Sequence, residues 1–226
     1  MKWYLNSGSA NQLYAKQFFR KKLLEHNSKS LLIISGQSTK PAHEIKRRML
    51  VGDPDLEKIA TLTFFDPREY QEGKIKLNNF DALYIVGGEA KRWDENVVSP
   101  AGEKFILDLK QYLFRNEGCY FGSSWGFMIM FSSFHSEMEL GEEANSFWYE
   151  KGLAIFTNVL AEVHYDESNN MVFLKSRHLA TLKDHPEFKC GMMFSGDCVL
   201  EIDSTNIAIW KILSGRYEVN KYYPEL

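Results

Sequence analysis

Short apolar runs alternate with helix-forming segments through the first half of the chain, and this alternation constrains the fold more than any other feature. Apolar residues dominate the runs at residues 31–34, 59–65, 82–86 and 119–121. Strands that are apolar throughout are buried on both faces, as happens in a parallel sheet that helices cover on both sides. The pattern therefore predicts an α/β protein with a mostly parallel sheet and helices on both faces.

The remainder of the chain extends this scheme, and no linker interrupts it. We therefore expect a single domain over residues 1–226, a length that suits one α/β domain. In the tail, Ser195-Gly-Asp197 has the composition of a turn and predicts a hairpin of the two strands beside it. The expected strands are residues 2–5, 30–35, 59–65, 81–86, 119–121, 152–165, 188–194, 198–202, 207–213 and 217–221, and the expected helices are 10–26, 41–50, 102–115 and 169–184.

The segment Gly122-Ser-Ser-Trp-Gly126 matches the pattern G-x-S-x-G, with Ser124 at its centre. A strand-like run precedes it, and apolar residues that suit the start of a buried helix follow it. Strand, tight turn and helix are the context of a nucleophile elbow, in which a strained serine is exposed above the sheet. Because short Gly/Ser patterns also occur by chance in turns, the pattern alone supports a plain turn about as well as a nucleophile.

Composition narrows the classes of function. The net charge of −3, with acidic and basic residues interspersed, gives no electrostatic reason to expect binding to nucleic acid or to an anionic membrane. No apolar run approaches the length of a membrane span, and the N-terminus is too polar for a signal peptide. Cys119, Cys190 and Cys198 are odd in number and form no C-x-x-C pair, which indicates reduced, buried thiols and a cytoplasmic protein.

Three blocks, in this order, resemble the serine peptidase family of dipeptidase E and cyanophycinase. They are the strand that leads into Gly87-Gly88, the segment around Ser124, and residues 152–165, which end in His164-Tyr165. The opening strand, the first helix and the 31–35 strand also fit, so the resemblance spans almost the whole chain. It implies a three-layer fold related to class I glutamine amidotransferases, with serine in place of their cysteine.

The resemblance also implies a catalytic triad. Ser124 would be the nucleophile and His164 the base, at the same sheet edge as the elbow, with the backbone amides of Gly88 and Trp125 as oxyanion donors. We expect the triad acid in the acidic loop between Ser124 and His164, where Glu142 is preferred and Glu139 is the alternative. Such a mechanism needs no metal and no organic cofactor. The other histidines are expected at the surface: His26, His43, His135, His178 and His185.

Some positions depart from the family pattern. Glu89-Ala90 stands where the family usually has Asn or Gln, and Trp125 replaces a small residue, so that an indole could fill or reshape the pocket. The arginines typical of cyanophycinase are missing after Tyr165, which argues against cyanophycin as the substrate.

Two hypotheses follow. The first is a serine peptidase that acts on short peptides, with a dipeptidase as one form. The second is a non-catalytic family member that binds a small ligand or a protein partner. An α/β-hydrolase esterase is a distant third, because no His-Gly-Gly-Gly-type motif is present. The oligomeric state is left open, with a homodimer as one option.

Overall fold

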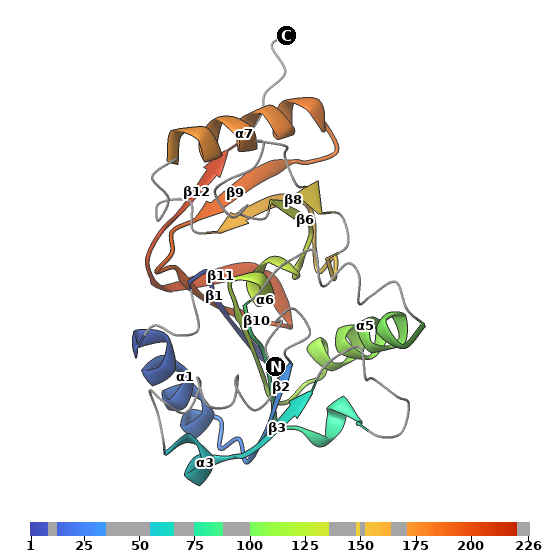
Figure 1. The fold of residues 1–226 in the computed structure, drawn as a ribbon, viewed down its shortest axis with the longest axis vertical. Coiled ribbons are helices and arrows are strands. Elements are labelled where there is room, and N and C mark those ends of the chain that lie inside the picture. Colours follow the sequence, from blue (N-terminus) through green and yellow to red (C-terminus); the bar gives the residue numbers. More distant parts are fainter. Residues whose placement is uncertain are drawn as a thin grey trace.

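Two β-sheets form the framework of the protein (Figure 1). The computed structural model describes residues 1–8, 13–34, 55–65, 75–87, 100–135, 148–149, 152–163 and 171–220. Within these residues the larger sheet has seven strands, in the order β11-β10-β1-β5-β4-β2-β3. Its strands are β1 (Lys2–Asn6), β2 (Ser30–Ile34), β3 (Thr61–Phe65), β4 (Ala82–Ile85), β5 (Cys119–Ser123), β10 (Val199–Asp203) and β11 (Asn206–Ser214).

The centre of the larger sheet is parallel. Strand β5 pairs in parallel with both β1 and β4, and β2 pairs in parallel with both β4 and β3. Only at one side do β10 and β11 add antiparallel pairs. The carboxyl ends of the five parallel strands therefore meet at one edge, which is where ligands bind in sheets of this kind.

Helices cover both faces of the larger sheet. Helix α1 (Leu13–Glu25) and the short α3 (Leu56–Ile59) pack on one face, where Phe19 and Leu23 join Tyr84 and Phe121 in a hydrophobic core. Helix α5 (Pro100–Leu113) packs on the other face through Phe105. A one-turn 3-10 helix, η2 (Leu77–Asn79), precedes β4. The predicted α/β fold, with a mostly parallel sheet between helices, is confirmed.

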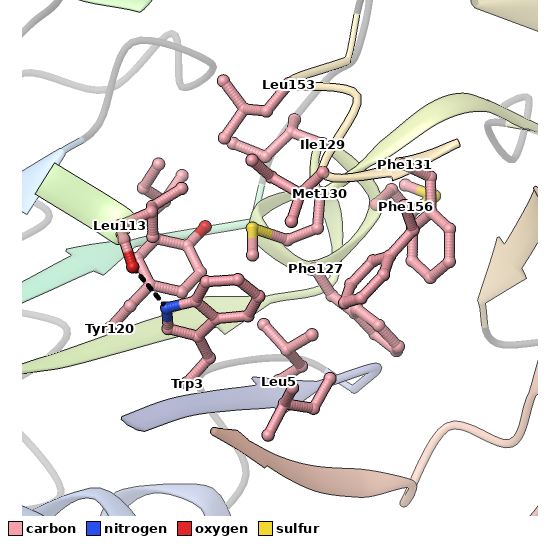
Figure 2. Packing of buried hydrophobic residues seen from close by; sticks show 14 of the residues in the cluster. Trp3, Leu5, Leu113, Tyr120, Phe127, Ile129, Met130, Phe131, Leu153 and Phe156 are labelled. Atoms are coloured by element: carbon pink, nitrogen blue, oxygen red, sulfur yellow. Dashed lines mark hydrogen bonds between the residues drawn. The ribbon is translucent and has the colours of Figure 1, made fainter. Parts of the chain in front are cut away.

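The smaller sheet extends the core on the α5 side. Its order is β12-β9-β8-β6-β7, with parallel pairs among β6, β8 and β9. Phe131, Phe156 and Phe194 from this sheet meet Phe127 and Trp210, with ring centroids 4.6 Å apart for Phe127 and Phe194. Figure 2 shows Phe127, Phe131 and Phe156 in this core. Helix α7 (Met171–Asp184) lies over it. Its strands are β6 (Phe131–His135), β7 (Trp148–Tyr149), β8 (Phe156–Val163), β9 (Cys190–Phe194) and β12 (Tyr217–Asn220).

One hydrophobic cluster contains residues of both sheets. That continuity is compatible with one folding unit, and a single domain over residues 1–226 stays a prediction. No helix in the described part of the chain is long and apolar enough to cross a membrane.

The predicted tail hairpin is wrong. Strands β9 and β10 do not pair with each other, because β9 lies between β8 and β12 whereas β10 lies between β1 and β11. Both strands are buried over most of their length, so each needs a neighbour on either side. The turn between them passes from one sheet to the other, and Ser195 anchors it by donating a hydrogen bond of 2.7 Å to Asp197.

Two further predictions need adjustment. Ile59 ends the short helix α3, and the strand predicted from it begins at Thr61. The helix expected after Ser124 is a single turn, α6 (Trp125–Met128), and strand β6 follows it directly. The helix predicted at residues 41–50 lies outside the described residues.

Candidate active site

Ser124 lies on a sharp turn between β5 and α6, at the carboxyl edge of the larger sheet. Its backbone has φ 50° and ψ −108°, a conformation that residues with a side chain rarely adopt. Such a conformation costs about 1–3 kcal/mol and persists only where the surroundings impose it. Ser124 is partly exposed, whereas the residues on either side of it are buried. The sequence pattern predicts this placement of Ser124.

The two glycines of the pattern are required by close backbone contacts. A β-carbon at Gly122 would lie 2.3 Å from the carbonyl oxygen of Gly126. A β-carbon at Gly126 would lie 2.2 Å from the carbonyl oxygen of Ile85. Neither position has room for a side chain, so the turn packs tightly against its own strand and against β4.

Main-chain hydrogen bonds hold the turn in place. The Ser124 amide donates to the carbonyl of Asn6, at the end of β1, over 2.8 Å. The Ser124 carbonyl accepts from the amides of Phe127 and Met128, at 2.9 and 3.1 Å. The serine is thus fixed on its amino side by a neighbouring strand and on its carboxyl side by the turn of α6.

Gly87 brings the Gly-Gly turn against the serine side chain. A β-carbon at Gly87 would lie 3.1 Å from Cβ and 3.6 Å from Oγ of Ser124. The first glycine of this turn therefore borders the serine, as a backbone segment that supplies an oxyanion donor must. Gly88, the predicted donor, lies outside the described residues, as does Glu89-Ala90.

Trp125 is completely buried in the core that joins the two sheets. The sequence raised the possibility that its indole fills or reshapes the pocket over the serine. In the structure the indole contributes to the hydrophobic core instead, while Ser124 keeps some exposure. A large residue fits at this position because the second sheet supplies apolar surface beyond the turn.

Two buried tyrosines reach the turn from opposite faces of the sheet. The Tyr84 hydroxyl, on the α1 face, lies 2.9 Å from the Ser123 hydroxyl. The Tyr120 hydroxyl, on the α5 face, donates to the Gly126 carbonyl over 2.6 Å. Burial raises the pKa of Tyr84 to about 12 and that of Tyr120 well above its usual range. Both hydroxyls are therefore protonated at neutral pH, and sequence reasoning did not identify either.

The other predicted members of the triad, His164, Glu142 and Glu139, lie outside the described residues. Strand β8 ends at Val163, immediately before His164. This strand belongs to the smaller sheet, and the expectation that His164 lies at the same edge as the elbow stays a prediction. The elbow ends a strand of the larger sheet.

A buried charged cluster links β8 to α7. Glu162 forms an ion pair with Arg177, and its carboxylate lies 3.3 Å from Nδ1 of His178. The side chains of Glu162 and His178 are 1% and 0% exposed, so the prediction of a surface position for His178 is wrong. The ring fits because Gly191 leaves space, since a β-carbon there would lie 2.1 Å from its Nε2. One signal was present in the sequence, because Glu162 is a lone charge in an apolar strand and must have a partner.

The remaining groups offer less chemistry. Cys119 and Cys198 are buried and Cys190 is partly buried, and all three are free thiols. Burial raises the pKa of the Cys119 thiol to about 11, which makes it a poor nucleophile. Among the described residues, no three His, Cys, Asp or Glu side chains are placed to hold a metal ion.

Comparison with known proteins gives a clear likeness in structure. No protein-family model matches the chain, and no curated protein matches it. Among solved structures, the fold is similar to that of a "Putative Peptidase E Protein" from Listeria monocytogenes EGD-e, with a TM-score of 0.60. The sequences are 18% identical, and the likeness covers 94% of this chain and 98% of the other. The chain therefore shares the fold of that protein, in agreement with the predicted α/β architecture.

Proposed function

We propose that this protein is a serine hydrolase that cleaves short peptides, with Ser124 as the nucleophile. The observation that carries the proposal is the strained backbone of Ser124, at φ 50° on a turn between a buried strand and a helix. Strain of this kind is stored at functional sites more often than elsewhere, and this strand-turn-helix context is that of a nucleophile elbow. The likeness to the Listeria protein, over 94% of the chain, supports a peptidase within this fold.

In the proposed reaction, the Ser124 hydroxyl attacks the peptide carbonyl as its proton moves to His164. His164 then protonates the leaving amine, and a covalent acyl-enzyme remains. A water molecule, deprotonated by His164, hydrolyses the acyl-enzyme and releases the acid and free Ser124. Glu142 orients the imidazole, with Glu139 as the alternative. The amides of Gly88 and Trp125 stabilise the oxyanion.

A fluorophosphonate probe tests the proposal, because it reacts covalently with activated serines. The wild type should be labelled at Ser124, as located by peptide mass spectrometry. Ser124→Ala and His164→Ala should each lower turnover or labelling by roughly 10⁴-fold or more, since the members of a triad act as a unit.

Ser204→Ala is the matched control. Ser204 follows β10, and its amide bonds to the carbonyl of Met1, at the opposite edge of the sheet from the elbow. This variant should be labelled like the wild type. A folded wild-type protein that takes up no probe would contradict the proposal and would favour a non-catalytic binding protein with this fold.

A further inference from the structure

The conformation of Ser124 cannot be a local preference of its own sequence. A positive φ at a residue with a side chain is unfavourable, and α6 supplies only one helical turn to oppose relaxation. Main-chain bonds hold the Ser124 amide to Asn6 and the Ser124 carbonyl to α6, but the residues next to these bonds must themselves be held in place by other contacts. Those contacts should come from rigid, buried groups next to the serine.

Tyr84 and Tyr120 meet this requirement. Tyr84 lies on β4, the neighbour of β5, and its hydroxyl contacts Ser123, which directly precedes the serine. Tyr120 lies on β5 itself and bonds to the carbonyl of Gly126, two residues after the serine. Both rings are buried in the hydrophobic cores on the two faces of the larger sheet, and Tyr120 is buried completely. Figure 2 shows Tyr120 among its neighbours. The two hydroxyls therefore hold the residues flanking Ser124 from opposite faces of the sheet.

We propose that Tyr84 and Tyr120 are positioning residues that keep Ser124 in its reactive orientation. This inference rests on the proposed function, because it assigns the tyrosines a role in the reaction of Ser124. Each hydroxyl acts through a neighbouring residue, Tyr84 through the side chain of Ser123 and Tyr120 through the backbone carbonyl of Gly126. Displacement of a reacting group by about 1 Å can cost roughly 100-fold in rate, which makes such control measurable.

The test is the kinetics of fluorophosphonate labelling, separated into the maximal rate constant kinact and the half-saturating probe concentration KI. Tyr84→Phe and Tyr120→Phe keep the buried rings and remove only the hydroxyls. Each should lower kinact by roughly 10- to 100-fold and leave KI unchanged, because the pocket is intact while the serine is less well oriented. Circular dichroism confirms the fold at the temperature of the assay.

Tyr112→Phe is the matched control. Tyr112 is also fully buried, and its hydroxyl donates to the Phe80 carbonyl over 3.1 Å, before the start of β4. The substitution therefore removes a buried hydroxyl of the same kind at the opposite edge of the sheet. It should leave both kinact and KI as in the wild type.

Ser123→Ala removes the hydroxyl that Tyr84 contacts, and it replaces Tyr84→Phe as the test if that variant does not fold. It should lower kinact as much as Tyr84→Phe does, and the double variant should lose no more than either single one. If the losses in kinact multiply when Tyr84→Phe and Ser123→Ala are combined, the inference is wrong. It is also wrong if both tyrosine variants keep the kinact of the wild type. Neither result would affect the proposed function. An unlabelled wild type would instead remove the proposed function, and the inference with it.

Discussion

Gly87 and Ser124 lie side by side at the carboxyl edge of the larger sheet, although they are 37 positions apart in the sequence and helix α5 lies between them. A β-carbon on Gly87 would lie 3.1 Å from Cβ of Ser124, closer than most carbon contacts of this kind. The pair arises because β4 and β5 are parallel neighbours that end together. Glycine at position 87 is thus explained by the serine opposite it.

The first prediction concerns this contact. Gly87→Ala should lower the rate of labelling at Ser124 by roughly 10-fold, because the added methyl group displaces the serine by a few tenths of an ångström. Overpacking should cost about 1–3 kcal/mol in the free energy of unfolding, as measured by urea denaturation.

Val86→Ala separates the two effects. Val86 is buried on the α1 face of the sheet and loses packing without placing a new atom against Ser124. It should be destabilised to a similar extent but label at the wild-type rate. Equal labelling rates in Gly87→Ala and Val86→Ala would show that the contact has no effect on the serine.

The second prediction concerns Trp125, whose indole is 0% exposed. Trp125→Ala should lower the free energy of unfolding by about 3–5 kcal/mol, as expected for a large aromatic side chain removed from a core. Trp125→Phe fills most of the space and should lose less. Urea titration followed by circular dichroism measures both.

If the indole instead covered the serine, Trp125→Ala would behave in the opposite way. It would label faster than the wild type and unfold at an unchanged urea concentration. That outcome would contradict the core position of Trp125 and would restore the pocket-filling role that the sequence suggested.

The elbow and the parallel half of the fold could be predicted because local signals coincide there. Buried strands 31–34 and 119–121 are apolar throughout, and the glycines around Ser124 mark a tight turn. The sheets to which β9 and β10 belong could not be predicted. Two buried strands joined by a turn have the same sequence pattern whether they pair with each other or belong to different sheets. The lone charge of Glu162 indicates that a buried partner is needed, but the identity of His178 as a neighbour depends on space left by Gly191, a tertiary contact that no local pattern shows.

The third prediction concerns acid stability. The amide of Thr205, the ammonium group of Lys2 and the Thr205 hydroxyl hold the pKa of Asp203 well below its usual range. A carboxyl whose pKa is lowered on folding stabilises the protein above its unfolded pKa, about 4, and this contribution is lost as the pH falls below that value. Asp203→Asn should therefore be less stable than the wild type at pH 7, by a difference that shrinks at pH 3.

Urea unfolding at the two pH values measures this difference. Lys2→Met supplies the comparison, because it removes one of the partners of Asp203 and leaves the bonds from Thr205 in place. Its loss of stability at pH 7 should be smaller than that of Asp203→Asn. A difference between wild type and Asp203→Asn that is the same at both pH values would contradict the assignment.

The last prediction concerns the buried cluster of Glu162, Arg177 and His178. Removing one partner of a buried ion pair leaves the other charged and desolvated, which typically costs about 3–5 kcal/mol. Glu162→Ala should lose stability on that scale, because its carboxylate meets both Arg177 and His178. Glu218→Ala is the matched control, since its partner Lys175 lies on the same helix but the pair is exposed, with side chains 39% and 46% accessible. Exposed pairs contribute about 0–1 kcal/mol, so this variant should remain near the wild type.

Replacing the whole cluster distinguishes a cost of broken pairing from a loss of packing. Glu162→Leu alone should be strongly destabilised, because it leaves the Arg177 guanidinium without its carboxylate. Adding Arg177→Met and His178→Leu to it should recover much of the loss, since a buried ionic cluster replaced by apolar groups of similar volume is often neutral. The triple variant would contradict this account if it were less stable than Glu162→Leu. In that case the cluster would stabilise the junction of β8 and α7 by its shape as well as by its charges.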